Sequence, residues 1–125
     1  MPAYLIVFLG AGFGGALRHG VNVAALRVLG SGLPYGTLTV NIVGSLVMGL
    51  LTGYFALKAD PGQMWRLFLT TGILGGFTTF SAFSLDTALL YERGVLGLTA
   101  LYVVVSVGIS IVALFAGLFI MRQLS

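Results

Sequence analysis

Long runs of apolar residues, separated by short polar stretches, make up most of the chain. A membrane-spanning helix needs about 20 apolar residues to cross a hydrocarbon core about 30 Å thick. The pattern predicts four such spans, at about residues 3–26, 35–57, 66–90 and 95–121. The connections between them are too short to hold a further domain. We therefore expect an all-α fold and a single integral membrane domain over residues 1–125.

Composition excludes a water-soluble fold. Of the 125 residues, 58% are hydrophobic and 7% are charged, whereas a typical soluble domain carries about 25% charged residues. There is no cysteine, which excludes a secreted disulfide scaffold. The six basic residues are scattered, so nucleic acid is not an expected partner. The expected surroundings are the lipid bilayer of the cell (inner) membrane, which the chain crosses several times.

Basic residues are divided evenly between the two ends of the predicted bundle. Three fall on each side, namely Lys58, Arg66 and Arg122 on one and Arg18, Arg27 and Arg93 on the other. A fixed topology normally shows an excess of Lys and Arg on the cytoplasmic side. The balance favours insertion in both orientations, and hence an antiparallel homodimer about a two-fold axis in the membrane plane. The alternative is that short loops hold too few charges to set a direction.

Glycine pairs spaced four residues apart recur in three of the spans, as Gly10/Gly14, Gly49/Gly53 and Gly72/Gly76. Small residues at this spacing let helices pack closely in a membrane. The first pair lies in a formal G-x-G-x-x-G, but a dinucleotide site also needs a βαβ unit and an acid about 20 residues later. The first acid of this chain is Asp60. The glycines therefore predict packing faces.

The chain contains few residues of the types that carry out catalysis. The chain has one His, no Cys and three carboxylates far apart in sequence, which gives neither a metal-ligand set nor an acid–base pair. We expect no enzyme. His19 lies beside Arg18 near the end of the first span, where an interfacial position is the default. Asp86 is the one acid that falls at membrane depth, near the end of the third span, and we expect it in a vestibule.

Uncharged polar residues recur every four positions in two spans, which places them on one helix face. They are Thr37, Asn41 and Ser45 in the second span and Tyr102, Ser106 and Ser110 in the fourth. One interpretation is that Ser and Thr bond their own helix and join neighbouring helices. Asn is harder to satisfy in this way, because its amide has two donors. Two uncharged polar tracks suit the passage of a small ion.

The third span contains a segment poorly suited to a continuous helix. Between Gly72 and Ser84 it holds three glycines and the adjacent pair Thr78 and Thr79. A break at this depth would free backbone carbonyls to bind a cation. Phe80 and Phe83 would share one helix face just beyond the break, where the positive edges of their rings can meet an anion.

These segments resemble the motifs of one membrane family, the Fluc (CrcB) fluoride channels. The matching segments are Gly15-Ala16-Leu17-Arg18, Gly36-Thr37-Leu38-Thr39-Val40-Asn41-Ile42-Val43-Gly44, and Gly72-x-x-Gly75-Gly76-x-Thr78-Thr79-Phe80-Ser81-x-Phe83-Ser84. The resemblance extends over essentially the whole chain. It departs from the family pattern at Ala82, where the family usually has Thr, and at Asp86, where Glu is expected.

The resemblance implies a dual-topology antiparallel homodimer with two pores, whose third helices are each broken at the centre. It implies a structural Na⁺ at the dimer interface, held by the backbone carbonyls of Gly75 and Thr78 from both subunits. It further implies a fluoride path lined by Asn41, Phe80, Phe83, Thr37, Tyr102, Ser106 and Ser110, with Arg18 and Asp86 in the vestibules. The expected function is passive export of cytoplasmic F⁻, which gives resistance to fluoride. That the ion is fluoride and not chloride follows from the resemblance alone.

Two other classes of membrane protein compete with this interpretation. A small multidrug exporter also has about four short spans and often dual topology, but it is expected to carry a membrane-embedded Glu in its first helix. The first span here contains no acid. A scaffold that transports nothing would show glycine packing faces without an uncharged Asn deep in a span.

Overall fold

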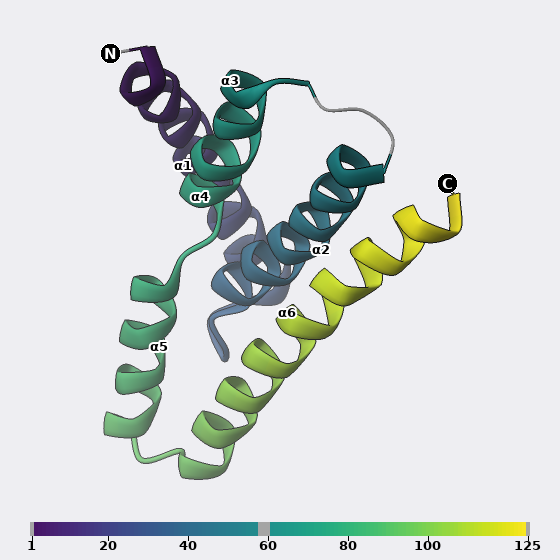
Figure 1. Cartoon of the computed structure of the whole chain (residues 1–125). Coiled ribbons are helices and arrows are strands. Elements are labelled where there is room, and N and C mark those ends of the chain that lie inside the picture. The colour runs from purple at the N-terminus through teal and green to yellow at the C-terminus, as the bar shows by residue number, and fades with distance from the viewer. Residues whose placement is uncertain (1, 58–60, 125) are drawn as a thin grey trace.

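The protein is a small bundle of helices of the length and composition that cross membranes. The computed structural model describes residues 2–57 and 61–124, and within them the regular elements are all helical. Four helical segments are long and apolar enough to span a bilayer (Figure 1). They are α1 (Pro2–Leu29), α2 (Tyr35–Leu57), the composite third segment (Gln63–Glu92) and α6 (Leu96–Leu124). Lys58 and Asp60 lie outside the described residues.

Glycine ends two of these helices. Gly30 follows α1 with φ 82°, and Gly94 follows the third segment with φ 81°. Both values lie in the left-handed region, which glycine adopts without a Cβ clash and which commonly closes a helix. Pro34 directly precedes α2, where its fixed φ suits a helix start. These short turns leave almost the whole chain for the spans.

The third segment is not one helix but four consecutive pieces. It begins with α3 (Gln63–Arg66), continues as the π-helix η1 (Leu67–Leu74) and the short α4 (Gly75–Phe77), and resumes as α5 (Phe80–Glu92). Thr78 and Thr79 between α4 and α5 are extended, with φ/ψ of −87°/159° and −154°/125°. The predicted central break is therefore confirmed.

The two halves of the third segment pack against different neighbours. The first half, from α3 to α4, lies along α1, whereas α5 packs mainly on α6 (Figure 1). The helices α2 and α6 form the most extensive pair. The break thus separates the half of the third segment that packs on α1 from the half that packs on α6.

Glycines make the close helix contacts possible, as their spacing predicts. A Cβ at Gly14 would collide with the carbonyl oxygen of Ile73, and one at Gly76 would collide with that of Ala11. Between α2 and α6, a Cβ at Gly49 would meet the carbonyl oxygen of Leu114. Helices in a bilayer associate through such backbone approaches, because lipid provides no hydrophobic drive between them.

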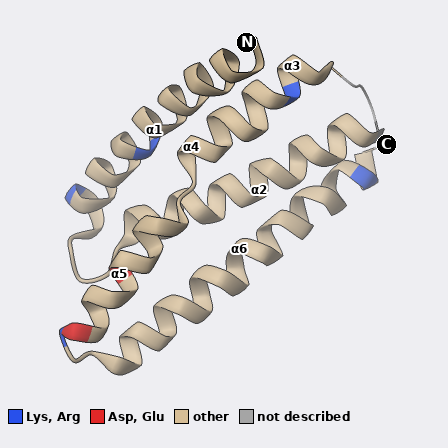
Figure 2. Ribbon diagram, turned by 60° about the vertical axis from the view of Figure 1, so that its left-hand side comes forward, with Lys and Arg blue, Asp and Glu red and all other residues tan. Residues whose placement is uncertain are grey.

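Charge is sparse along the ribbons and absent from α2 (Figure 2). Large apolar side chains are exposed instead, above all on α1 and α6, where Phe8, Val104 and Phe115 are each more than half exposed. Such a surface suits lipid and not water. The chain is a multi-pass membrane protein.

Candidate functional site

Asn41, on α2, hydrogen-bonds the backbone at the break in the third segment. Its Oδ1 accepts the backbone N–H of Thr79 at 2.8 Å, and its Nδ2 donates to the carbonyl oxygen of Thr79 at 2.9 Å. The side chain therefore supplies an acceptor for the N–H of Thr79, which the interrupted helix leaves without one, and adds a donor to the Thr79 carbonyl. One further N–H of Nδ2 remains, since a carboxamide carries two donors.

Two more hydrogen bonds fix the break. The Thr79 hydroxyl accepts the N–H of Ala82 at 3.1 Å and so caps the start of α5. On the opposite side, Nε of Arg18 in α1 donates to the carbonyl oxygen of Gly76 at 3.0 Å. Arg18 is half-buried, and its charge lies at the carboxyl end of α4, where a cation is favoured. The residue expected in a vestibule is thus bonded to the backbone of the break.

A cavity of about 300 Å³ opens beside the break. Ten residues of α2, α5, α6 and the break line it: Asn41, Ser45, Thr78, Thr79, Phe80, Phe83, Ser106, Val107, Ser110 and Ile111. We call it the central cavity. Five of the residues predicted for an ion path, at positions 41, 80, 83, 106 and 110, therefore meet at one place.

The hydroxyl groups of Ser106 and Ser110 make no hydrogen bond of good geometry to the described residues, although both oxygens are buried. Ser106 lies near the Tyr102 hydroxyl, one turn earlier on α6. The other buried hydroxyls behave differently. Thr99, also on α6, donates to the carbonyl oxygen of Val95 at 2.9 Å, one turn earlier. Bonding to their own helix therefore does not account for the two serines. Buried polar groups are nearly always satisfied, so an unpaired pair in a cavity indicates a hydrogen-bonding partner from outside the described residues.

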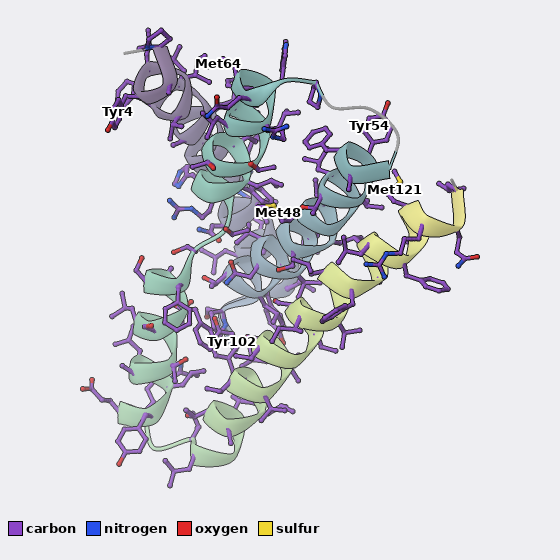
Figure 3. The ribbon with its side chains drawn as sticks, in the orientation of Figure 1. Tyr4, Met48, Tyr54, Met64, Tyr102 and Met121 are labelled. Atoms are coloured by element: carbon purple, nitrogen blue, oxygen red, sulfur yellow. The ribbon has the colours of Figure 1, made fainter. Side chains whose placement is uncertain are left out.

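The two phenylalanines lie side by side but in different surroundings. The ring centroids of Phe80 and Phe83 are 5.5 Å apart, and those of Phe83 and Tyr102 are 5.3 Å apart. Phe83 and Tyr102 are 8% and 2% exposed, whereas Phe80 is 74% exposed. Figure 3 shows Tyr102 reaching from α6 toward α5. The three rings form a continuous aromatic row from the inside of the chain to its surface.

The polar track continues beyond the central cavity to Asp86. The hydroxyl of Tyr102 donates to Oδ2 of Asp86 at 3.2 Å. Asp86 and the buried Thr37 line a second cavity of about 230 Å³, close to the turn between α1 and α2. Asn22 lines this second cavity too. The sequence patterns missed Asn22, because it belongs to no repeat of uncharged polar residues spaced four apart; its signal is that it interrupts the apolar end of the first span.

The break also leaves backbone oxygens without helical donors. The N–H of Thr79 would bond the carbonyl of Gly75 in a continuous helix, but here it bonds Asn41. Thr78 is extended, and its carbonyl lies outside both flanking helices. Among the described residues there is no group of three or more His, Cys, Asp or Glu that could hold a metal. A cation at this place would rest on carbonyl oxygens such as those of Gly75 and Thr78.

Comparison with known proteins adds a consistent assignment. The family model described as CrcB-like protein, Camphor Resistance (CrcB), matches residues 5–118. A protein of Nitrobacter hamburgensis named fluoride-specific ion channel FluC 2 is 56% identical over 122 residues, covering 98% of both chains. Proteins named fluoride-specific ion channel FluC are similar as well: that of Rhodopseudomonas palustris (strain BisB5) is 59% identical over 98% of both chains, and that of Methylobacterium nodulans is 61% identical over 95% of both.

Proposed function

Because this chain belongs to the CrcB family, with curated relatives of nearly equal length named fluoride-specific ion channels, we propose that it is a fluoride channel. It is not an enzyme, and the competing exporter interpretation is not favoured, since residues 1–26 contain no acid to serve as a proton site. The protein lies in the cell membrane and lets cytoplasmic F⁻ leave passively, which gives resistance to fluoride. A negative interior favours this exit by about 2.3 kcal/mol per 100 mV.

The unpaired hydroxyls of Ser106 and Ser110 are the observation that carries the proposal. Fluoride is small and strongly hydrated, so a pore must offer hydrogen-bond donors in place of water. The central cavity supplies two hydroxyls and the remaining N–H of Asn41, with no carboxylate among its lining residues. The edges of Phe80 and Phe83 add partial positive charge. An acceptor-type anion satisfies every one of these groups.

The proposed assembly is an antiparallel homodimer with two pores. Phe80, beside the central cavity, is mostly exposed in a single chain, and Gly75 is exposed as well. A second copy packed against the region of the break would cover both. The basic residues support either orientation, with Arg18, Arg27 and Arg93 on one side opposing Lys58, Arg66 and Arg122 on the other.

A structural Na⁺ fits the same face. The carbonyls of Gly75 and Thr78 are hard oxygen donors without helical partners, which suits an alkali cation. One chain supplies only a partial set, and a two-fold axis through the break would double it. In this proposal the ion holds the two breaks together. The side chains of each subunit then offer hydrogen-bond donors to fluoride along the track.

Fluoride efflux from liposomes, measured with a fluoride electrode and with chloride as the control ion, tests the function. The wild-type protein should release fluoride and retain chloride. A Ser106→Ala, Ser110→Ala variant should lose about tenfold or more of the fluoride flux, because each hydrogen bond to a charged partner is worth about 1.5–3 kcal/mol. The matched control is Thr99→Val, which removes a buried hydroxyl that its own helix already satisfies. Equal fluoride flux in all three proteins would overturn the role of the serines.

A further inference from the structure

A polar chamber lies at the end of the track farthest from the break. It consists of the second cavity, of about 230 Å³, and an adjoining one of about 220 Å³. The two share Leu26, Leu33, Pro34 and Asp86 as lining residues. We call them together the outer cavity. Their polar side chains come from α1, α2, α5 and the connecting turns: Asn22, Ser31, Tyr35, Thr37, Asp86 and Arg93.

Asn22 is the residue of this chamber that no proposal above explains. It is half-buried, and its carboxamide has no hydrogen bond to any residue in the described parts of the chain. The first turn of α2 lies directly against it, since a Cβ on Gly36 would overlap Oδ1 of Asn22 and approach its Cα to 2.9 Å. The glycine at position 36 therefore makes room for an amide at this place.

Donors predominate in the outer cavity. Asn22 offers an NH₂ group, and Thr37 a hydroxyl that also interacts with the hydroxyl of Tyr102. The N–H groups of Gly36 and Thr37 in the first turn of α2 add to them, because the start of a helix leaves such groups without intrahelical acceptors. Those of Tyr35 and Leu38 already bond the carbonyl oxygens of Leu33 and Pro34. Arg93 brings a positive charge to the adjoining part. The one carboxylate, Asp86, already accepts the Tyr102 hydroxyl. This set suits a small anion better than a cation.

The outer cavity is connected to the central cavity through one side chain. Tyr102 contacts Phe83, which lines the central cavity, and bonds Asp86, which lines the outer one. We propose that the outer cavity is a second binding site for the permeating fluoride, in which Asn22 and Thr37 donate to the ion and Arg93 draws it in. Asp86 keeps this binding weak enough for the ion to leave, as conduction requires. The inference rests on the proposed fluoride channel.

Fluoride efflux measured over a range of internal fluoride concentrations tests the site. Asn22→Ala removes the donor and should raise the half-saturating concentration about tenfold, the effect of losing one hydrogen bond to an ion, with the maximal rate close to the parental one. Asn22→Ser retains a hydroxyl donor and should lie between. His19→Ala is the matched control, because His19 is exposed on the same helix and lines neither cavity.

A second variant probes the charge. Arg93→Gln should lower the fluoride flux at low ionic strength, and the difference should vanish in high salt, because exposed charges are then screened. Unchanged half-saturation in Asn22→Ala, or a lower maximal rate at unchanged half-saturation, would overturn the outer site. A wild-type protein that passes no fluoride would instead overturn the proposed function, so the two failures are distinguishable.

Discussion

Asn41 joins two helices through a single side chain, and at the same time faces the central cavity. Its position on the face of Thr37 and Ser45 is readable from the sequence. Its partner is not, because Thr79 lies 38 residues away and nothing local indicates that contact. The same holds for Arg18, whose partner Gly76 is 58 residues away. Spacing predicts which residues share a face, whereas long-range hydrogen bonds need the packed structure.

Replacing Asn41 by Asp should abolish fluoride transport. The carboxylate keeps an acceptor for the N–H of Thr79, but it loses the donor to the Thr79 carbonyl and adds a negative charge beside the cavity. Like charges repel strongly at such short range in a medium of low dielectric constant. The measurement is fluoride efflux from liposomes with protein that elutes at the parental size. Parental flux in this variant would remove Asn41 from the path.

The two phenylalanines should respond differently to replacement by Ile. Phe83 is buried against Tyr102, so Phe83→Ile should cost about 1–2 kcal/mol of stability, whereas the mostly exposed Phe80 should tolerate the change within one chain. If ring edges contact fluoride, both variants should nevertheless lose flux, because Ile lacks the positive rim. Thermal unfolding and efflux, measured on the same samples, separate the two effects. A folded Phe80→Ile, Phe83→Ile double variant with parental flux contradicts the contact.

At the scale of helices, the sequence predicts the break more readily than its surroundings. Gly75, Gly76 and the two threonines mark the interruption in any context, because glycine and adjacent β-branched residues weaken a helix. The π-helical form of Leu67–Leu74 has no such mark. It depends on how η1 lies along α1, where Gly10 and Gly14 bring the two backbones together. A shift in hydrogen bonding set by a neighbouring helix cannot be derived from composition.

The glycine face of α1 gives a prediction with its own internal control. Gly14→Ala places a Cβ against the Ile73 carbonyl, so α1 and η1 must separate, at a cost of about 1–3 kcal/mol. Gly12→Ala on the same helix meets nothing within 4 Å and should be neutral. The melting temperature of the purified protein in detergent is the measurement. Similar melting temperatures for the two variants would show that the helices do not approach as closely as the structure has them.

For the whole molecule, the open question is what covers the region of the break. Phe80 packs beside Phe83 but is 74% exposed, Gly75 is exposed, and the carbonyls freed at the break would be only part of the proposed cation site. An antiparallel second copy, related by a two-fold axis, would cover these exposed residues and complete the proposed cation site. The even distribution of basic residues is the sequence feature that predicts it, and it remains a prediction.

Charges added at one end should decide the orientation and thereby test the dimer. Gln63→Lys with Gln123→Lys adds positive charge at one end of the bundle, and Val28→Lys with Glu92→Lys adds it at the other; all four residues are exposed. Each pair should fix a single topology, because Lys and Arg are retained on the cytoplasmic side. Either variant alone can then form no antiparallel dimer, so it should lose fluoride flux, whereas co-expression of the two should restore it. The orientation itself can be read from the accessibility of a terminal tag on either side of the membrane. Full activity of one variant expressed alone, with its topology shown to be uniform, would rule out the antiparallel assembly and with it the shared sodium site.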